Sequence, residues 1–196
     1  MTRLRWPIIS LVLGLCLFLT TQVQAQSQPY TRFTWALTTG LNFISPPLTT
    51  NITAAKLCQI HKLLTKIETL PVSSSDLVWQ TYSCTQPDAE ANFTLLPNVG
   101  YLITASRSTS LTLKGTPSAE FPATYPVGYN AIGVSVAEDY GISVDELCGP
   151  MVGGNQVAQV DWYQNGQWVS YDCQTLPFIR LPVLKGQGYL IKVLPL

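Results

Sequence analysis

The chain carries one pattern twice, and this internal repeat constrains the fold more than any other feature. Trp-x-x-Tyr-x-Cys ends at Cys84 and again at Cys173, and Gly-Tyr-Leu-Ile begins at Gly100 and again at Gly188. The offsets are 89 and 88 residues, so the copies differ only by small insertions and deletions. Two shorter matches precede these motifs in each copy: Phe33 with Phe121, and Leu57-Cys58 with Leu147-Cys148. The repeat predicts tandem duplicated domains.

Residues 1–25 predict a signal peptide. Arg3 and Arg5 precede an apolar run over residues 8–19, and the small-x-small sequence of residues 23–25 is typical of a cleavage site. The run is shorter than the roughly 20 residues of a transmembrane helix. We therefore expect a secreted or extracytoplasmic protein, in the periplasm or at the cell surface, that does not span the membrane after signal cleavage. The predicted domains are residues 26–116 and 117–196.

The mature chain of 171 residues holds four cysteines, Cys58, Cys84, Cys148 and Cys173. An even number of cysteines in an exported protein indicates disulfides, and four cysteines allow three pairings. Duplication favours Cys58–Cys84 and Cys148–Cys173, because each copy would then close its own bridge. Each bridge would stabilise its copy by about 3 kcal/mol under the chain-entropy model.

The order of predicted elements gives a mainly β fold built from small α+β units, each with one short helix pinned by a disulfide. Ser143 and Glu146 form a capping-box pattern, so a helix is expected to begin at Val144. Helix-spaced apolar residues predict a longer helix in the first copy, from Thr53 to about Thr65. Residues 33–48 and 121–136 are each predicted to form a strand around a turn-forming glycine, and residues 157–173 a hairpin. Further strands are predicted at residues 77–84, 101–105 and 189–194, with an extra one at 108–114.

Asn165-Gly166 lies between two β-rich runs and predicts a type I′ hairpin turn. The turn pairs Tyr163 with Trp168 and sets the register along both strands. Because side chains alternate between faces, one face of the hairpin is apolar and must be core. That face carries Ala158, Val160, Trp162, Val169, Tyr171 and Cys173.

The other face of the hairpin supplies the candidate ligand-binding residues. Tyr163 and Trp168 lie on it beside Gln159, Asp161 and Asp172. A flat aromatic pair bordered by carboxylates and amides is typical of a surface on which a sugar stacks. Two other interpretations stay open: the aromatic pair can simply stabilise the hairpin, or this face can be buried against the other copy.

Two segments resemble a known repeat. Residues 40–47 (Gly-Leu-Asn-Phe-Ile-Ser-Pro-Pro) and 128–132 (Gly-Tyr-Asn-Ala-Ile) resemble the opening Gly-Trp-Asn-Leu-Ile-Ser-Leu-Pro of a repeat carried by many secreted bacterial surface proteins. Residues 186–191 (Gly-Gln-Gly-Tyr-Leu-Ile) resemble its closing strand, Gly-x-Gly-Tyr-Trp-Ile. Leu41 and Tyr129 replace the opening Trp, and the cysteine pair is not part of the family pattern. The resemblance implies an extracellular, non-enzymatic module and supplies no ligand.

Other patterns give no catalytic residue, metal or cofactor. His61 is the only histidine and follows Cys58 at metal-ligand spacing, but the remaining cysteines are expected in bridges. Residues 139–145 have the alternate spacing of a calcium loop within an acidic cluster, Glu138, Asp139, Asp145 and Glu146, but lack its middle ligands and its glycine. Helix capping accounts for Asp145 and Glu146. Residues 51–53 and 92–94 are glycosylation sequons.

These observations favour a non-enzymatic structural or interaction protein of the cell surface or extracellular matrix, with self-assembly left open. Its partner would be protein, either a second copy or a surface component, or a glycan. A mature net charge of about −2, with no basic block, argues against nucleic acid. The alternative is a carbohydrate- or peptide-binding module that uses the exposed aromatic face.

Overall fold

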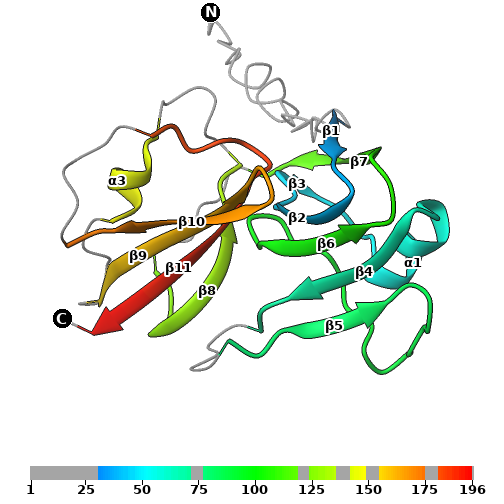
Figure 1. The fold of residues 1–196 in the computed structure, drawn as a ribbon, viewed down its shortest axis with the longest axis horizontal. Coiled ribbons are helices and arrows are strands. Elements are labelled where there is room, and N and C mark those ends of the chain that lie inside the picture. Colours follow the sequence, from blue (N-terminus) through cyan, green and yellow to red (C-terminus); the bar gives the residue numbers. More distant parts are fainter. Residues whose placement is uncertain are drawn as a thin grey trace, which may run out of the picture.

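The computed structural model describes residues 31–71, 77–118, 124–135, 142–148, 155–174 and 181–195. The predicted signal peptide, Phe121, Glu138 and Asp139 lie outside these residues. Within them the protein is mainly β, as predicted, with three antiparallel sheets and two short helices. We call residues 31–118 the N-terminal half and residues 124–195 the C-terminal half (Figure 1).

The N-terminal half contains two sheets and a helix. A four-stranded sheet has the order β2-β6-β4-β5, and a three-stranded sheet has the order β1-β7-β3. The helix α1 (Ala54–Ile60) is capped by Thr53, whose hydroxyl accepts a hydrogen bond from the Lys56 N–H. The strands are β1 (Thr31–Leu37), β2 (Gly40–Ile44), β3 (Leu48–Thr49), β4 (Leu64–Thr69), β5 (Gln80–Ser83), β6 (Tyr101–Ala105) and β7 (Thr109–Pro117).

The described part of the C-terminal half is one four-stranded sheet and one helix. The sheet has the order β10-β9-β11-β8, and α3 (Val144–Leu147) begins at the predicted residue. The Ser143 N–H donates to the Glu146 carboxylate, as the capping box requires. The strands are β8 (Gly128–Gly133), β9 (Asn155–Gln164), β10 (Gln167–Asp172) and β11 (Gly188–Pro195).

The two four-stranded sheets have the same strand order. Reading each from its opening strand gives β2-β6-β4-β5 in one half and β8-β11-β9-β10 in the other. Local hydrogen bonds match as well. The Tyr101 hydroxyl accepts from the Leu96 N–H, and the Tyr189 hydroxyl accepts from the Leu184 N–H, at 2.7 and 2.8 Å. Burial raises the pKa of Tyr101 to about 12 and also raises that of Tyr189, which keeps both hydroxyls protonated.

Each four-stranded sheet buries apolar side chains on both faces. In the N-terminal half one face packs against the three-stranded sheet and α1, and in the C-terminal half one face packs against α3. The opposite faces of the two sheets meet each other. This shared cluster consists of Phe43, Leu70 and Leu102 from the N-terminal half with Ala131 and Leu190 from the C-terminal half.

The halves also exchange backbone hydrogen bonds in a reciprocal pattern. The Ser45 N–H donates to the Gly186 carbonyl, and the Gly133 N–H donates to the Asn98 carbonyl, both at 2.9 Å. Single β-bridges join Ile44 to Gln187 and Val99 to Ile132. In each case the segment before one half's closing strand pairs with the end of the other half's opening strand. A side chain at Gly133 would collide with Ser45, so this approach requires glycine.

One prediction about the N-terminal half is wrong. The helix predicted to reach about Thr65 ends at Ile60, and Leu64–Thr69 forms β4 instead. β4 pairs with both β5 and β6, so its hydrogen bonds come from segments distant in sequence. Tertiary pairing overrides the helical spacing of Leu57, Ile60 and Leu64.

Candidate functional site

The β9–β10 hairpin has the predicted register. Tyr163 is opposite Trp168 and Val160 is opposite Tyr171, and both turn residues have positive φ, 52° at Asn165 and 82° at Gly166. The apolar face packs into the core of the C-terminal half, with Val160 and Tyr171 fully buried. Trp162 is only partly buried there, and its indole N–H donates to the Gln164 side-chain carbonyl.

The predicted aromatic pair lies at the boundary between the halves. The Tyr163 and Trp168 ring centroids are 5.6 Å apart, and the Trp168 centroid is 5.5 Å from that of Phe43. Trp168 remains 43% exposed, whereas Tyr163 packs against the shared cluster. The N-terminal half therefore partly covers the hairpin face that was expected to be exposed. Burial of this face against the other copy was one of the alternatives that the sequence allowed.

The polar residues predicted on this face divide into a buried and an exposed group. Asp161 is only 7% exposed, and its carboxylate accepts hydrogen bonds from Ser170 and Gln159. The expectation that Asp161 is exposed is therefore wrong. Its carboxylate on β9 is buried where it accepts the hydrogen bond from Ser170 on β10. Asp172 is exposed and accepts from the Gln174 N–H. The structure does not bring the five residues together as one open surface.

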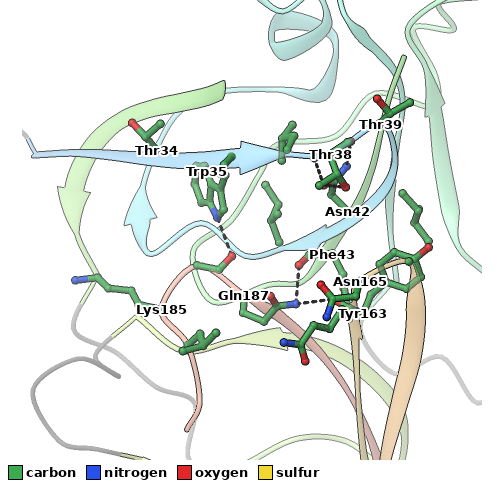
Figure 2. Close-up of a pocket in the computed structure, with 18 of the residues that line it drawn as sticks. Thr34, Trp35, Thr38, Thr39, Asn42, Phe43, Tyr163, Asn165, Lys185 and Gln187 are labelled. Atoms are coloured by element: carbon green, nitrogen blue, oxygen red, sulfur yellow. Dashed lines mark hydrogen bonds between the residues drawn. The ribbon is translucent and has the colours of Figure 1, made fainter. Parts of the chain in front are cut away.

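A cavity of about 570 Å³ opens beside the hairpin, between the two halves (Figure 2). Its lining comes from four segments: β1 with the following turn (residues 33–39), β2 (residues 41–44), the hairpin tip (residues 163–166) and residues 184–187. We call it the seam groove. Its size is in the range of ligand pockets. The described lining residues carry aromatic, aliphatic, hydroxyl and amide side chains, and Lys185 is the one ionisable residue among them apart from Tyr163.

Two side chains hold the seam groove together. The indole N–H of Trp35, on β1, donates to the Gly186 carbonyl at 2.7 Å in a buried hydrogen bond. The Gln187 amide donates to the Phe43 carbonyl at 3.0 Å and to the Tyr163 carbonyl at 3.4 Å. Figure 2 shows the Gln187 amide between β2 and the hairpin, with both hydrogen bonds drawn. The groove wall is therefore fixed by bonds between the halves.

A second, smaller cavity of about 210 Å³ occupies the equivalent place on the C-terminal half. Its lining includes Pro97, Asn98 and Val99, where the seam groove has Lys185, Gly186 and Gln187. Opening-strand residues match too, with Asn130 and Ile132 in place of Asn42 and Ile44. Because the two cavities are lined by equivalent positions of the two halves, the smaller cavity can serve as a control for the seam groove.

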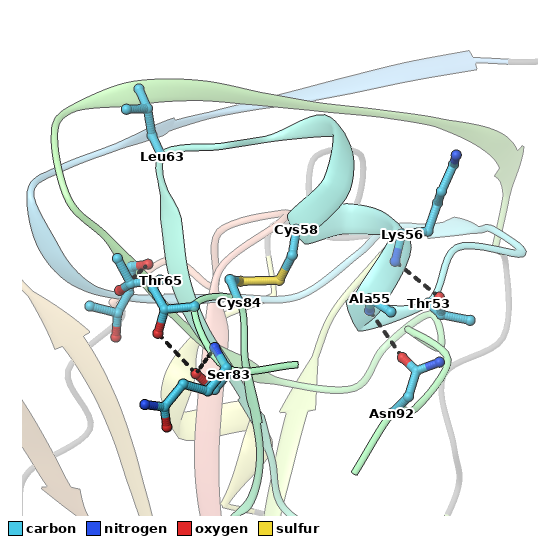
Figure 3. The surroundings of a disulfide bond; sticks show 12 residues. Thr53, Ala55, Lys56, Cys58, Leu63, Thr65, Ser83, Cys84 and Asn92 are labelled. Carbon is cyan, nitrogen blue, oxygen red and sulfur yellow. Dashed lines mark hydrogen bonds between the residues drawn. A yellow bond between two sulfur atoms is a disulfide. The ribbon is translucent and has the colours of Figure 1, made fainter. Parts of the chain in front are cut away.

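Both disulfides form with the predicted pairing. Cys58 on α1 joins Cys84 after β5, and Cys148 after α3 joins Cys173 after β10, with Cα–Cα distances of 5.3 and 5.4 Å. In Figure 3 the first bridge lies between the helix and the sheet edge, where the Cys84 N–H donates to the Thr65 carbonyl. Disulfides of this kind are consistent with an oxidising compartment.

The remaining candidates from the sequence are His61 and the acidic residues of the second copy. His61 is the C-cap residue of α1, and its backbone N–H donates to the Leu57 carbonyl. Partial burial lowers the pKa of its imidazole. Within the described residues no three side chains from His, Cys, Asp and Glu gather as metal ligands. Asp145 and Glu146 lie in the first turn of α3, and residues 139–141 of the segment with calcium-loop spacing lie outside the described residues.

Apart from Tyr163, the sequence patterns did not indicate the residues that build the groove. Phe43, Trp35 and Gln187 carry no local signal of contact, and the Gln187–Phe43 bond joins residues 144 apart. The one usable signal was the repeat, because Gln187 replaces Val99 at equivalent positions of two otherwise similar segments.

No helix among the described residues is long and apolar enough to cross a membrane. Comparison of the chain with protein-family models, with curated proteins and with solved structures finds no match.

Proposed function

We propose that this protein is a non-enzymatic, exported interaction protein of the cell surface or extracellular matrix, built from a duplicated β unit, and that it holds its partner in the seam groove. The observation that carries the proposal is the lining of that groove. Aromatic and amide side chains from both halves meet there around a cavity of about 570 Å³. Such a lining provides contact area and hydrogen bonds, and the described residues that line the groove include no carboxylate, imidazole or thiol.

The rigidity of the groove supports a binding role. Its walls are joined by the Trp35–Gly186 and Gln187–Phe43 hydrogen bonds, so the partner would meet a preformed site. A preformed site loses little conformational entropy when it binds. The two disulfides and the expected signal peptide support export.

Obstruction of the groove tests this proposal. Ala36 is exposed on β1 and lines the seam groove, so Ala36→Trp would fill it without removing a core side chain. Thr124→Trp is the matched control, because exposed Thr124 has the same place in the smaller cavity. Both variants would be compared with wild type by light scattering for self-association and on arrays of defined glycans and peptides.

Loss of association or binding in Ala36→Trp alone supports the proposal. Equal behaviour of all three proteins would contradict it.

The alternative is a carbohydrate-binding module on the partly exposed Trp168. It is favoured by one observation, the 43% exposure of that indole beside Tyr163. Glycan binding that is lost in Trp168→Ala and kept in Ala36→Trp would select this alternative.

A further inference from the structure

The seam groove is lined by strand edges rather than by a sheet face. Residues 33–39 and 41–44 contribute without interruption. Along a strand, alternate side chains point to opposite faces, so a face would supply every second residue only. A continuous run along one cavity means that the backbone edge borders it. β1 and β2 are both outer strands of their sheets.

One end of the β2 edge is already covered by the protein's own chain. Residues 186–187 run beside it, with the Ser45 N–H bonded to the Gly186 carbonyl and a bridge between Ile44 and Gln187. The Gln187 side-chain amide takes the next acceptor, the Phe43 carbonyl. The chain thus pairs with β2 as an added strand would, and this pairing stops at Phe43.

The next position on this edge is Leu41. In an antiparallel strand the backbone groups of alternate residues point to the same side, so the N–H and C=O of Leu41 share the outer edge with those of Phe43. Within the described residues β2 is paired only with β6 and, at Ile44, with Gln187. The Leu41 edge borders the seam groove, with the side chains of Tyr163 and Leu184 on the groove walls.

We infer that the seam groove binds an extended polypeptide segment, which adds as a strand to the edge of β2 in line with residues 186–187. This inference rests on the proposed function and names its ligand class. The unpaired edge of β2 presents backbone N–H and C=O groups in alternation. An extended polypeptide presents matching acceptors and donors at the same spacing, whereas a glycan has hydroxyls at other spacings. Among the described lining residues only Lys185 carries a formal charge, so we expect a largely uncharged segment.

The test uses the full mature chain and a displayed library of random decapeptides. A selected peptide is resynthesised with N-methyl groups on the odd or on the even backbone amides. Strand addition requires only one of these sets, because only alternate amides face β2. We expect one set to weaken binding by about tenfold or more, equivalent to about 1.4 kcal/mol, and the other to leave it nearly unchanged. Equal effects of both sets, or failure of the library to yield a binder, would overturn the inference.

Two proline variants locate the strand. Proline is tolerated on an edge strand where its missing N–H faces outward. Leu41→Pro should therefore abolish peptide binding, and Tyr129→Pro, at the equivalent position of β8, should not. If Leu41→Pro does not fold, as judged by its thermal melt, the N-methyl series on the wild-type protein decides alone.

The outcomes separate the inference from the proposed function. If Ala36→Trp abolishes binding of a glycan and no peptide binds, the groove is functional and the strand-addition inference is wrong. If peptides bind equally well to Ala36→Trp, both are wrong.

Discussion

Phe43 should be the side chain on which the packing of the two halves depends most. It is 2% exposed at the centre of the shared cluster. Its ring centroid is 5.5 Å from that of Trp168 and 6.2 Å from that of Trp79, two residues at equivalent positions of the repeat. A Cβ placed on Gly100 or Gly188 would lie 2.8 or 2.6 Å from the Phe43 ring, so both closing strands contact it closely.

Phe43→Ala should lower the free energy of unfolding by about 3–5 kcal/mol, the usual cost of emptying a buried aromatic site. For a chain of this size each kcal/mol corresponds to roughly 2–4 °C in Tm. The expected decrease in Tm is therefore about 6–20 °C, measured by calorimetry or by chemical denaturation of the mature protein.

The equivalent residue of the C-terminal half allows a sharper test. Ala131 also lies in the shared cluster, next to Gly100, so one large and one small side chain occupy equivalent places. Ala131→Phe alone should cost about 1–3 kcal/mol through overpacking. The double variant Phe43→Ala, Ala131→Phe restores the total volume, and it should be more stable than Phe43→Ala alone.

A pair that does not share this space provides the control. Phe93 stacks on Tyr101 in the other core of the N-terminal half, and Phe93→Ala combined with Ala131→Phe should be additive. If the Phe43 and Ala131 changes are equally additive, the two side chains do not share one volume, and the packing argument is refuted.

Three further predictions concern the hairpin, the histidine and a disulfide. In a double-mutant cycle, the effects of Trp168→Ala and Phe43→Ala on the free energy of unfolding should be coupled by about 0.5–1.5 kcal/mol, the value of an aromatic pair. A coupling near zero would mean that Trp168 does not interact with Phe43. The lowered pKa of His61 means that the unfolded chain binds its proton more tightly, so stability present above pH 6.5 is lost as the pH falls through the lower pKa of the folded state. Unfolding curves at pH 7 and pH 5 should thus show a smaller pH effect in His61→Gln than in wild type, with no change in binding; an equal pH effect would assign the dependence to other groups. Replacing both Cys58 and Cys84 by serine should cost about 3 kcal/mol in denaturant unfolding, and an unchanged stability would mean that this bridge constrains little of the unfolded chain.

Local chemistry explains which elements were predictable from the sequence. Asn165-Gly166 specifies a two-residue turn, and the turn fixes every pair of the β9–β10 hairpin. Ser143 and Glu146 specify the start of α3 in the same local way. The disulfide pairing followed from the repeat, which places one helix cysteine and one strand cysteine in each half.

Non-local contacts explain which elements were not. Leu64, the first residue of β4, continues the helical spacing of Leu57 and Ile60, and only the pairing of β4 with β5 and β6 selects a strand. The exposure of the hairpin face depended on whether the other half covered it, which no pattern within the hairpin reveals. The seam groove draws on four separate segments, so its residues could be identified only once the halves were placed together.

The two equivalent cavities differ in the side chains of the segment that borders each of them. Residues 97–99 and 185–187 make the same kind of backbone pairing, since each segment pairs with the opening strand of the other half. Pro97 and Val99 are compatible with that pairing, so the pairing itself does not require the side chains of Lys185 and Gln187. The Gln187 amide makes additional bonds to Phe43 and Tyr163, and these shape the larger cavity. We therefore expect the ligand of the proposed function at the seam groove, and we expect Ala36→Trp rather than Thr124→Trp to abolish its binding.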